Sequence, residues 1–212
     1  RIMTRTTAIG YYHQNMVGLC QKLTDHLTSP PQDAPRERLW RVRAGQVILA
    51  QGAIERPLVF DGNDRPGVML AGAAQTYLNR YGVKVGNRPA ILTSHDSAWH
   101  AAFDLADAGV NVAAIIDTRV RIDDALTEGA RARGIEVLLG HTATATAGRL
   151  RVTNVRVNPM RSGKPGPARR ITCDALLMCG GWTPSLHLFS HTKGTLHWDA
   201  EAQVYLPGDQ AE

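Results

Sequence analysis

The stretch that decides the fold runs from Pro89 to Asp117 and reads PAILTSHDSAWHAAFDLADAGVNVAAIID. Its opening, PAILT, is typical of a short strand buried on both faces of a parallel sheet. Small and apolar residues then recur at helical spacing over Ser97–Ala108, and Gly109 supplies a helix stop. A second apolar run, Asn111–Ile116, leads to Asp117. The stretch therefore predicts a strand–helix–strand unit with parallel strands.

The following residues extend this unit. Ile122–Arg133 predicts a helix that stops at Gly134, and Ile135–Leu139 predicts a third strand, which completes the βαβαβ half of a Rossmann fold. Beyond it, three segments alternate like antiparallel strands: Thr142–Thr146, Leu150–Val157 and Ala168–Thr172. The expected fold class is α/β, with a three-layer Rossmann-like domain and an antiparallel β excursion.

Two flanking segments share a second pattern. Gln46–Pro57 (QVILAQGAIERP) and Ala175–Pro184 (ALLMCGGWTP) each run through a strand, a small residue and a glycine to a proline. Glycine lets the main chain pass close to a ligand or to another strand. Within the first segment, Gln46–Ala50 predicts a parallel strand buried on both faces. Three other elements are expected at Thr4–Tyr12 (strand), Leu39–Arg43 (strand) and Ala71–Tyr81 (helix).

Composition and charge limit the classes of partner. The 212 residues are 43% hydrophobic, which is ordinary for one globular domain or a domain and a half. The net charge of +5 depends on one run, because seven basic residues and no acid lie between Arg149 and Arg170. Prolines and glycines within that run indicate a solvated hairpin tip, and the rest of the chain carries −2. We therefore expect no nucleic-acid partner.

The cysteines and the apolar runs indicate the compartment. No apolar run approaches the ~20 residues that cross a bilayer, and no secretory signal opens the chain. An odd number of cysteines (Cys20, Cys173 and Cys179) is typical of reduced thiols. The expectation is a cytoplasmic protein without a membrane partner.

The turn after the first strand decides whether the Rossmann-like unit binds a dinucleotide. A ribose-binding acid is well placed, because Asp117 lies 24 residues after Thr93 at the end of the second strand. The glycine-rich turn is degenerate: Thr93, Ser94, His95, Asp96 and Ser97 precede Ala98 where Gly-x-Gly-x-x-Gly/Ala is usual. Asp96 would also repel a phosphate at the helix N-terminus.

Two interpretations of this turn remain open. Either a nucleotide binds there, and Asp117 then favours NAD over NADP, or Asp96 or Ser97 merely caps the helix and the domain holds no ligand. With the two glycine exits included, the candidate nucleotide-binding residues are Gln51, Gly52, Ala53, Thr93, Ser94, His95, Asp96, Ser97, Asp117, Gly180 and Gly181.

Other groups of cysteine, histidine and tryptophan residues do not predict a metal, redox or ligand-binding site. Cys179, His187 and His191 are too few for a recognisable zinc spacing, so we assign no metal. Cys173 and Cys179 lack the spacing of a redox-active pair. Trp182 is expected to pack at a strand exit rather than to stack on a ligand. No residue is assigned as catalytic.

Four stretches carry a resemblance that covers nearly the whole chain: Thr7–Tyr12 (TAIGYY), Gly52–Pro57 (GAIERP), Asp64–Met69 (DRPGVM) and Gly180–Pro184 (GGWTP). The layout resembles flavoproteins with two dinucleotide-binding domains. More narrowly, the stretches resemble the α subunit of heterotetrameric sarcosine oxidases. The resemblance implies that residues 1–60 and 175–212 belong to an FAD/NAD-type domain. The resemblance further implies that residues 61–83 form a linker and a helix. Residues 84–174 would then form an inserted Rossmann-like NAD(P)-type domain that includes the β-hairpin.

The resemblance also implies a function. The family demethylates sarcosine oxidatively, with NAD in the α subunit, FAD and FMN in the complex, and the β subunit as the main partner. The first glycine-rich turn of the family would precede residue 1, and further domains would follow Glu212. This region would then be a non-catalytic nucleotide-binding part of a CH–NH oxidoreductase. Alternatives are a stand-alone NAD(P)H:flavin reductase, a related amine, opine or proline dehydrogenase subunit, and a structural module whose nucleotide site has decayed.

Overall fold

The computed structural model describes residues 2–161 and 164–209, and the chain divides into two compact units. Unit 2 comprises Glu55–Trp182, and unit 1 combines Arg1–Ile54 with Thr183–Glu212. The chain passes between the units along β4 (Ala53–Glu55) and β14 (Trp182–Pro184), which pair with each other. No helix of the described residues is long and apolar enough to span a membrane.

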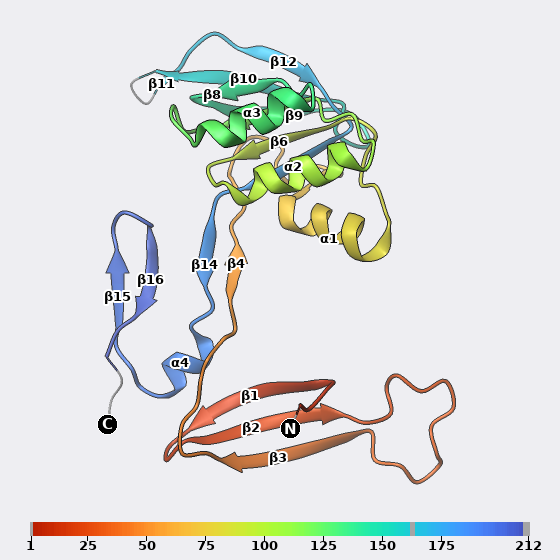
Figure 1. Ribbon diagram of the computed structural model, residues 1–212, viewed down its shortest axis with the longest axis vertical. Helices are drawn as coiled ribbons and strands as arrows, with labels where there is room; N and C mark the ends of the chain where they lie inside the picture. The colour runs from red at the N-terminus through yellow and green to blue at the C-terminus, as the bar shows by residue number, and fades with distance from the viewer. Residues whose placement is uncertain (1, 162–163, 210–212) are drawn as a thin grey trace. The chain divides into compact units, whose positions relative to one another are not determined.

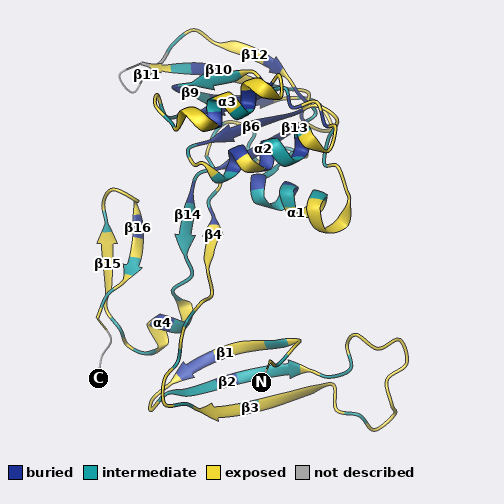
Figure 2. Ribbon diagram, in the orientation of Figure 1, coloured by how far each residue is buried: buried dark blue, intermediate teal, exposed yellow. Residues whose placement is uncertain are grey.

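Unit 2 is built on a five-stranded parallel sheet in the order β5-β13-β6-β7-β8. Its strands are β5 (Val68–Leu70), β6 (Pro89–Thr93), β7 (Ala114–Asp117), β8 (Val137–Leu139) and β13 (Ala175–Cys179). Every residue of β6, β7 and β13 is buried, as the dark central strands in Figure 2 show. The strand–helix–strand prediction is confirmed, because β6 and β7 pair in parallel across the intervening helix.

Three helices cover one face of this sheet: α1 (Ala71–Tyr81), α2 (Ser97–Asp107) and α3 (Asp124–Ala132). Their small residues allow close packing. Ala98, Ala101 and Ala102 of α2 are all buried, together with Trp99 and Leu105. Asp123 caps the N-terminus of α3, and its carboxylate accepts a hydrogen bond from Ala125 N at 2.9 Å.

An antiparallel sheet covers the other face (Figure 1), so the predicted α/β fold with an antiparallel excursion is confirmed. Its strands are β9 (His141–Ala147), β10 (Asn154–Arg161), β11 (Lys164–Pro165) and β12 (Arg169–Thr172). Val155 and Val157 of β10 are fully buried against the parallel sheet. The predicted strand Leu150–Val157 begins only at Asn154, because Leu150 lies in a bend and is 82% exposed.

Unit 1 contains the three-stranded antiparallel sheet β1-β2-β3, formed by Thr6–Tyr12, Met16–Lys22 and Glu37–Arg43. The sequence predicted the first and third strands and missed the second. A short helix, α4 (His187–His191), and a hairpin of β15 (Leu196–Asp199) and β16 (Val204–Pro207) complete the unit.

The predicted parallel strand at Gln46–Ala50 is wrong for this structure. The segment has no strand assignment, and Ile48 is 91% exposed. A strand needs a neighbour for its backbone hydrogen bonds, and no segment of the described residues supplies one here.

Candidate functional site

The site lies at the carboxyl ends of three parallel strands in unit 2. Thr93, the last residue of β6, is in register with Asp117 of β7 on one side and with Cys179 of β13 on the other. Ligands of doubly wound sheets bind beyond this edge, where the strand order reverses. The structure therefore brings together most of the predicted nucleotide-binding residues: Thr93, Ser94, His95, Asp96, Ser97, Asp117, Gly180 and Gly181.

The turn after β6 is held by its own side chains. The Thr93 hydroxyl donates to the His95 carbonyl oxygen at 2.7 Å and accepts from His95 N at 2.9 Å. Ser94 N donates to the Cys179 carbonyl oxygen at 3.0 Å. Thr93 thus stands where glycine is usual, and its side chain hydrogen-bonds the backbone of the same turn. We call this a closed turn.

The helix cap differs from both predicted caps. His95 Nδ1 accepts from Ser97 N at 3.1 Å, whereas the side chain of Asp96 makes no capping hydrogen bond. Asp96 has helical backbone angles (φ −64°, ψ −30°), not the extended conformation from which an N-cap side chain reaches back. The cap interpretation that named Asp96 or Ser97 is therefore corrected to His95.

Asp117 is fully buried, and both of its carboxylate oxygens are occupied. Oδ1 accepts from Arg119 N at 2.9 Å and from Arg119 Nε at 3.1 Å. Oδ2 accepts from Arg119 Nη2 at 2.8 Å and from Trp99 Nε1 at 2.9 Å. These four donors leave no place for a ribose hydroxyl.

Arg119 also reaches the helix N-terminus, since its Nη1 lies 2.8 Å from Asp96 Oδ1. The carboxylate of Asp117, and then that of Asp96, raise the pKa of the Arg119 guanidinium, which stays charged. The guanidinium thereby joins the end of β7 to the start of α2.

These contacts do not fit a dinucleotide pyrophosphate at this turn. Such a site offers free amides at a helix N-terminus and glycines that let the phosphate approach. Here the Ser97 amide is taken by His95, and the Asp96 carboxylate adds negative charge.

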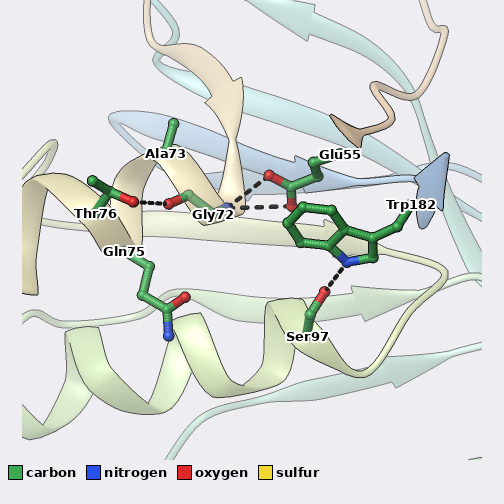
Figure 3. A pocket seen from close by; sticks show the side chains of 7 residues that line it. All are labelled: Glu55, Gly72, Ala73, Gln75, Thr76, Ser97 and Trp182. Atoms are coloured by element: carbon green, nitrogen blue, oxygen red, sulfur yellow. Dashed lines mark hydrogen bonds between the residues drawn. The ribbon is translucent and has the colours of Figure 1, made fainter. Parts of the chain in front are cut away.

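A cavity of about 370 Å³ lies beside the turn (Figure 3). It is lined by Glu55, Gly72, Ala73, Gln75, Thr76, Ser97 and Trp182. Sequence reasoning assigned only Ser97 of these to a site. The other residues come from segments up to 127 residues apart, so spacing in the sequence does not group them. The sequence signals were the Glu-Arg-Pro stretch, which contains Glu55, and the Gly-Gly-Trp-Thr-Pro stretch, which contains Trp182.

Glu55 holds the N-terminus of α1. Its carboxylate is buried and accepts from Gly72 N, at 2.9 Å to Oε2 and 3.2 Å to Oε1 (Figure 3). The positive end of the helix dipole favours a carboxylate in this position. A side chain at Gly72 would collide with Glu55, because an added Cβ would lie 2.8 Å from Oε2.

Trp182 and Cys179 meet at Ser97. The Ser97 hydroxyl accepts from Trp182 Nε1 at 3.0 Å and lies 3.5 Å from Cys179 Sγ. Burial raises the pKa of the Cys179 thiol, and Glu55 raises it further. Cys179 is therefore a protonated thiol at neutral pH, and the cluster forms a neutral hydrogen-bonding surface rather than an activated nucleophile.

The two glycine exits differ in surroundings. Gly180 lies between backbone segments, since an added Cβ would be 3.1 Å from the carbonyl oxygens of both Arg56 and Pro57. Gly52, in unit 1, has φ +71° and open space where a Cβ would lie. Its neighbour Gln51 donates a hydrogen bond through Nε2 to the Ser185 carbonyl oxygen, and Ala53 begins β4.

One histidine of α4 contacts the backbone of β1. His191 Nδ1 accepts from Tyr11 N at 3.3 Å. Within residues 2–161 and 164–209, no group of three or more His, Cys, Asp or Glu side chains is placed to hold a metal ion.

Comparison with known proteins identifies the relatives of this arrangement. The chain is 42% identical over 210 residues to the sarcosine oxidase subunit alpha of Rhizobium meliloti (strain 1021), covering 98% of this chain and 20% of that protein. The chain is a homologue of sarcosine oxidase α subunits. The α subunit of Corynebacterium sp. (strain U-96) is 40% identical over 212 residues, covering 98% of this chain and 22% of that protein. The chain thus spans about a fifth of the length of these α subunits. No family model matches it.

Solved structures agree with the fold of this α-subunit homologue. An FAD-dependent pyridine nucleotide-disulphide oxidoreductase from Desulfovibrio vulgaris superimposes with a TM-score of 0.57 at 15% identity. The match covers 92% of this chain and 47% of that one. The predicted resemblance and fold class are confirmed.

Proposed function

We propose that this α-subunit homologue is a nucleotide-binding region of a sarcosine oxidase-like complex that oxidatively demethylates sarcosine. The observation that carries the proposal is identity of 40–42% over nearly all of the chain with two proteins named sarcosine oxidase subunit alpha. The proposal includes NAD in the α subunit, FAD or FMN elsewhere in the complex, and a β subunit as the main partner. No step of the chemistry is assigned to residues of this chain.

Within this region, the inserted domain is proposed to be a scaffold and not the NAD site. Support comes from the closed turn, where His95 caps α2 and Asp117 accepts four hydrogen bonds from Trp99 and Arg119. Of the two interpretations left open by the sequence, this geometry favours the one in which the turn holds no nucleotide.

The flanking segments are proposed to belong to an FAD/NAD-type domain that holds the nucleotide. At Gly52 the positive φ and the open space fit a main chain that passes close to a ligand. The unpaired segment Gln46–Ala50 also borders an apolar hollow of about 260 Å³, which Tyr11, Val17 and Leu188 line with it.

The test uses the full-length α subunit with its partner subunits. Acid release of bound nucleotide followed by mass spectrometry is expected to yield NAD, and sarcosine is expected to drive oxygen consumption. Asp117→Ala should retain the NAD stoichiometry, whereas Gly52→Val should lower it, because only the second change puts a side chain where the nucleotide is proposed to approach. Gly109→Val is a matched control at another positive-φ glycine with open space.

Three results would contradict the proposal. Loss of NAD from Asp117→Ala alone would place the nucleotide in the insert. A flavin on this polypeptide that NADH reduces would favour the flavin reductase alternative. Oxidation of opines or proline in place of sarcosine would assign the related dehydrogenase class.

A further inference from the structure

The outer face of the antiparallel sheet carries two arginines directly opposite each other. Arg156 of β10 pairs in register with Arg170 of β12, and both side chains are exposed. The adjacent pair, Val155 and Ile171, points inward and is buried. Like charges directly opposite on one face of an antiparallel pair are destabilising. The arrangement therefore works against the stability of the hairpin itself.

Neighbouring acids do not neutralise this pair. Glu136 forms an ion pair with Arg169, at 2.6 Å between Oε1 and Nη1. The Asp174 carboxylate accepts from two backbone N–H groups at 2.7 and 2.9 Å. Asp61 lies beside β9, in register with Ala145. The ion pairs found among the described residues include none from these acids to the two arginines.

One of the two guanidinium groups is already oriented. Arg156 Nε donates to Thr144 Oγ1 at 3.2 Å, and that hydroxyl donates to Asn158 Oδ1 at 2.7 Å. The hydrogen bond from Nε to Thr144 of β9 restricts rotation of the Arg156 side chain and so orients its two terminal nitrogens. A preoriented guanidinium binds a carboxylate with less loss of side-chain entropy.

We propose that this face, defined by Arg156, Arg170, Thr144, Asn154 and Thr172, binds a carboxylate-rich surface of a partner subunit. The inference rests on the proposed function, because it takes the chain to be part of a multi-subunit assembly. Charge complementarity identifies the chemistry of the partner. The guanidinium groups of Arg156 and Arg170 form no ion pair among the described residues, so they are able to bind carboxylates of another subunit. The face offers hydroxyl and amide groups beside them and no aromatic ring, whereas single-stranded nucleic-acid sites stack bases on aromatic side chains.

The experiment compares charge-reversal variants in the full-length, assembled complex. Arg156→Glu combined with Arg170→Glu is expected to raise the dissociation constant for the partner subunits at least ~tenfold at low salt and to flatten its salt dependence. The control, Lys84→Glu combined with Arg121→Glu, makes the same change in net charge at two exposed positions of unit 2 and should stay within ~twofold of the wild type.

A single variant separates assembly from folding. Arg156→Glu places opposite charges across the strand pair from Arg170, so the hairpin should be at least as stable as in the wild type while assembly is weakened. Arg156→Lys provides an amine that a carbodiimide joins to a contacting carboxylate, and peptide mass spectrometry is expected to find that carboxylate on another polypeptide.

Other outcomes overturn the inference. An unchanged dissociation constant in the double variant would show that this face is not part of the interface. A cross-link from position 156 to a carboxylate of the same chain would show that the face packs within the subunit. Binding of a single-stranded oligonucleotide that the double variant abolishes would assign it to nucleic acid. If the wild-type subunit neither assembles nor oxidises sarcosine, the proposed function fails as well, whereas a normal complex with an insensitive face refutes this inference alone.

Discussion

Replacing Arg119 with alanine tests how far unit 2 depends on the ion pairs of this guanidinium with Asp117 and Asp96. The change removes the Nε and Nη2 donors from Asp117 and the Nη1 contact to Asp96. Asp117 would keep only Trp99 Nε1 and one backbone N–H. A fully buried carboxylate would then lack a counter-ion.

The magnitude follows from the burial of the two partners. Removing one partner of a buried ion pair costs about 3–5 kcal/mol, and removing one partner of an exposed pair costs about 0–1 kcal/mol. The Asp117 side chain is 0% exposed and that of Arg119 is 32% exposed, so the pair lies between these limits. We expect the free energy of unfolding to fall by about 2–3 kcal/mol, which lowers Tm by about 4–12 °C for a protein of this size.

Urea denaturation followed by tryptophan fluorescence is the assay, because Trp99 is fully buried and contacts Asp117. Two controls bracket the result. Asp96→Asn removes only the more exposed contact of Arg119 and should cost about 0–1 kcal/mol. Arg121→Ala changes an exposed arginine nearby and should stay within about 0.5 kcal/mol of the wild type.

A loss of less than about 0.5 kcal/mol in Arg119→Ala would refute the reasoning, since it would mean that Asp117 does not depend on this guanidinium. Arg119→Lys keeps the charge without the two-pronged geometry and should be intermediate. A lysine variant as unstable as the alanine variant would assign the effect to geometry rather than to charge.

Three further predictions concern packing and thiol chemistry. Gly72→Ala should lower the free energy of unfolding by only about 0–1 kcal/mol, because displacing the Glu55 carboxylate from Gly72 N offsets the preference of a helix for alanine. Glu55→Ala in the same chain should remove that conflict, and additive losses would contradict it. Gly180→Ala should cost ~1–3 kcal/mol by crowding two backbone carbonyl oxygens, and an unchanged urea midpoint would show that the backbone yields. Burial raises the pKa of Cys173 to about 11. At pH 8 its thiol should therefore react with iodoacetamide far more slowly than the partly exposed Cys20, and the rate should rise as the pH approaches 11. Equal rates for the two thiols in the native protein would contradict this burial.

Unit 2 combines the sheet topology of a ligand-binding fold with a turn whose polar groups contact one another. Its parallel sheet keeps the strand order that creates a ligand crevice, while Arg119, Asp96 and His95 fill the helix N-terminus with internal contacts. The same carboxyl edge also borders the cavity of Glu55 and Trp182.

The local sequence determined most strands and all three helices of unit 2, although the edge strand β5 (Val68–Leu70) was not predicted. The apolar runs of β6, β7 and β13 are continuous, as expected for parallel strands buried on both faces, and the spacing of the small residues in α2 marks the buried face of that helix. The antiparallel excursion was predictable from alternation in β10, where the exposed Arg156 lies between the buried Val155 and Val157.

The tertiary structure decided where hydrogen-bond partners come from. Gln46–Ala50 has the composition of a strand, yet composition cannot supply the neighbour that a strand needs. Asp117 has the position of a ribose-binding acid, but its carboxylate is occupied by Arg119, two residues along the chain, and by Trp99 Nε1, which only the packing of α2 on the sheet brings to 2.9 Å. Periodicity reports which face of an element is buried, whereas the occupancy of a polar group depends on donors that the fold brings together from elsewhere in the chain.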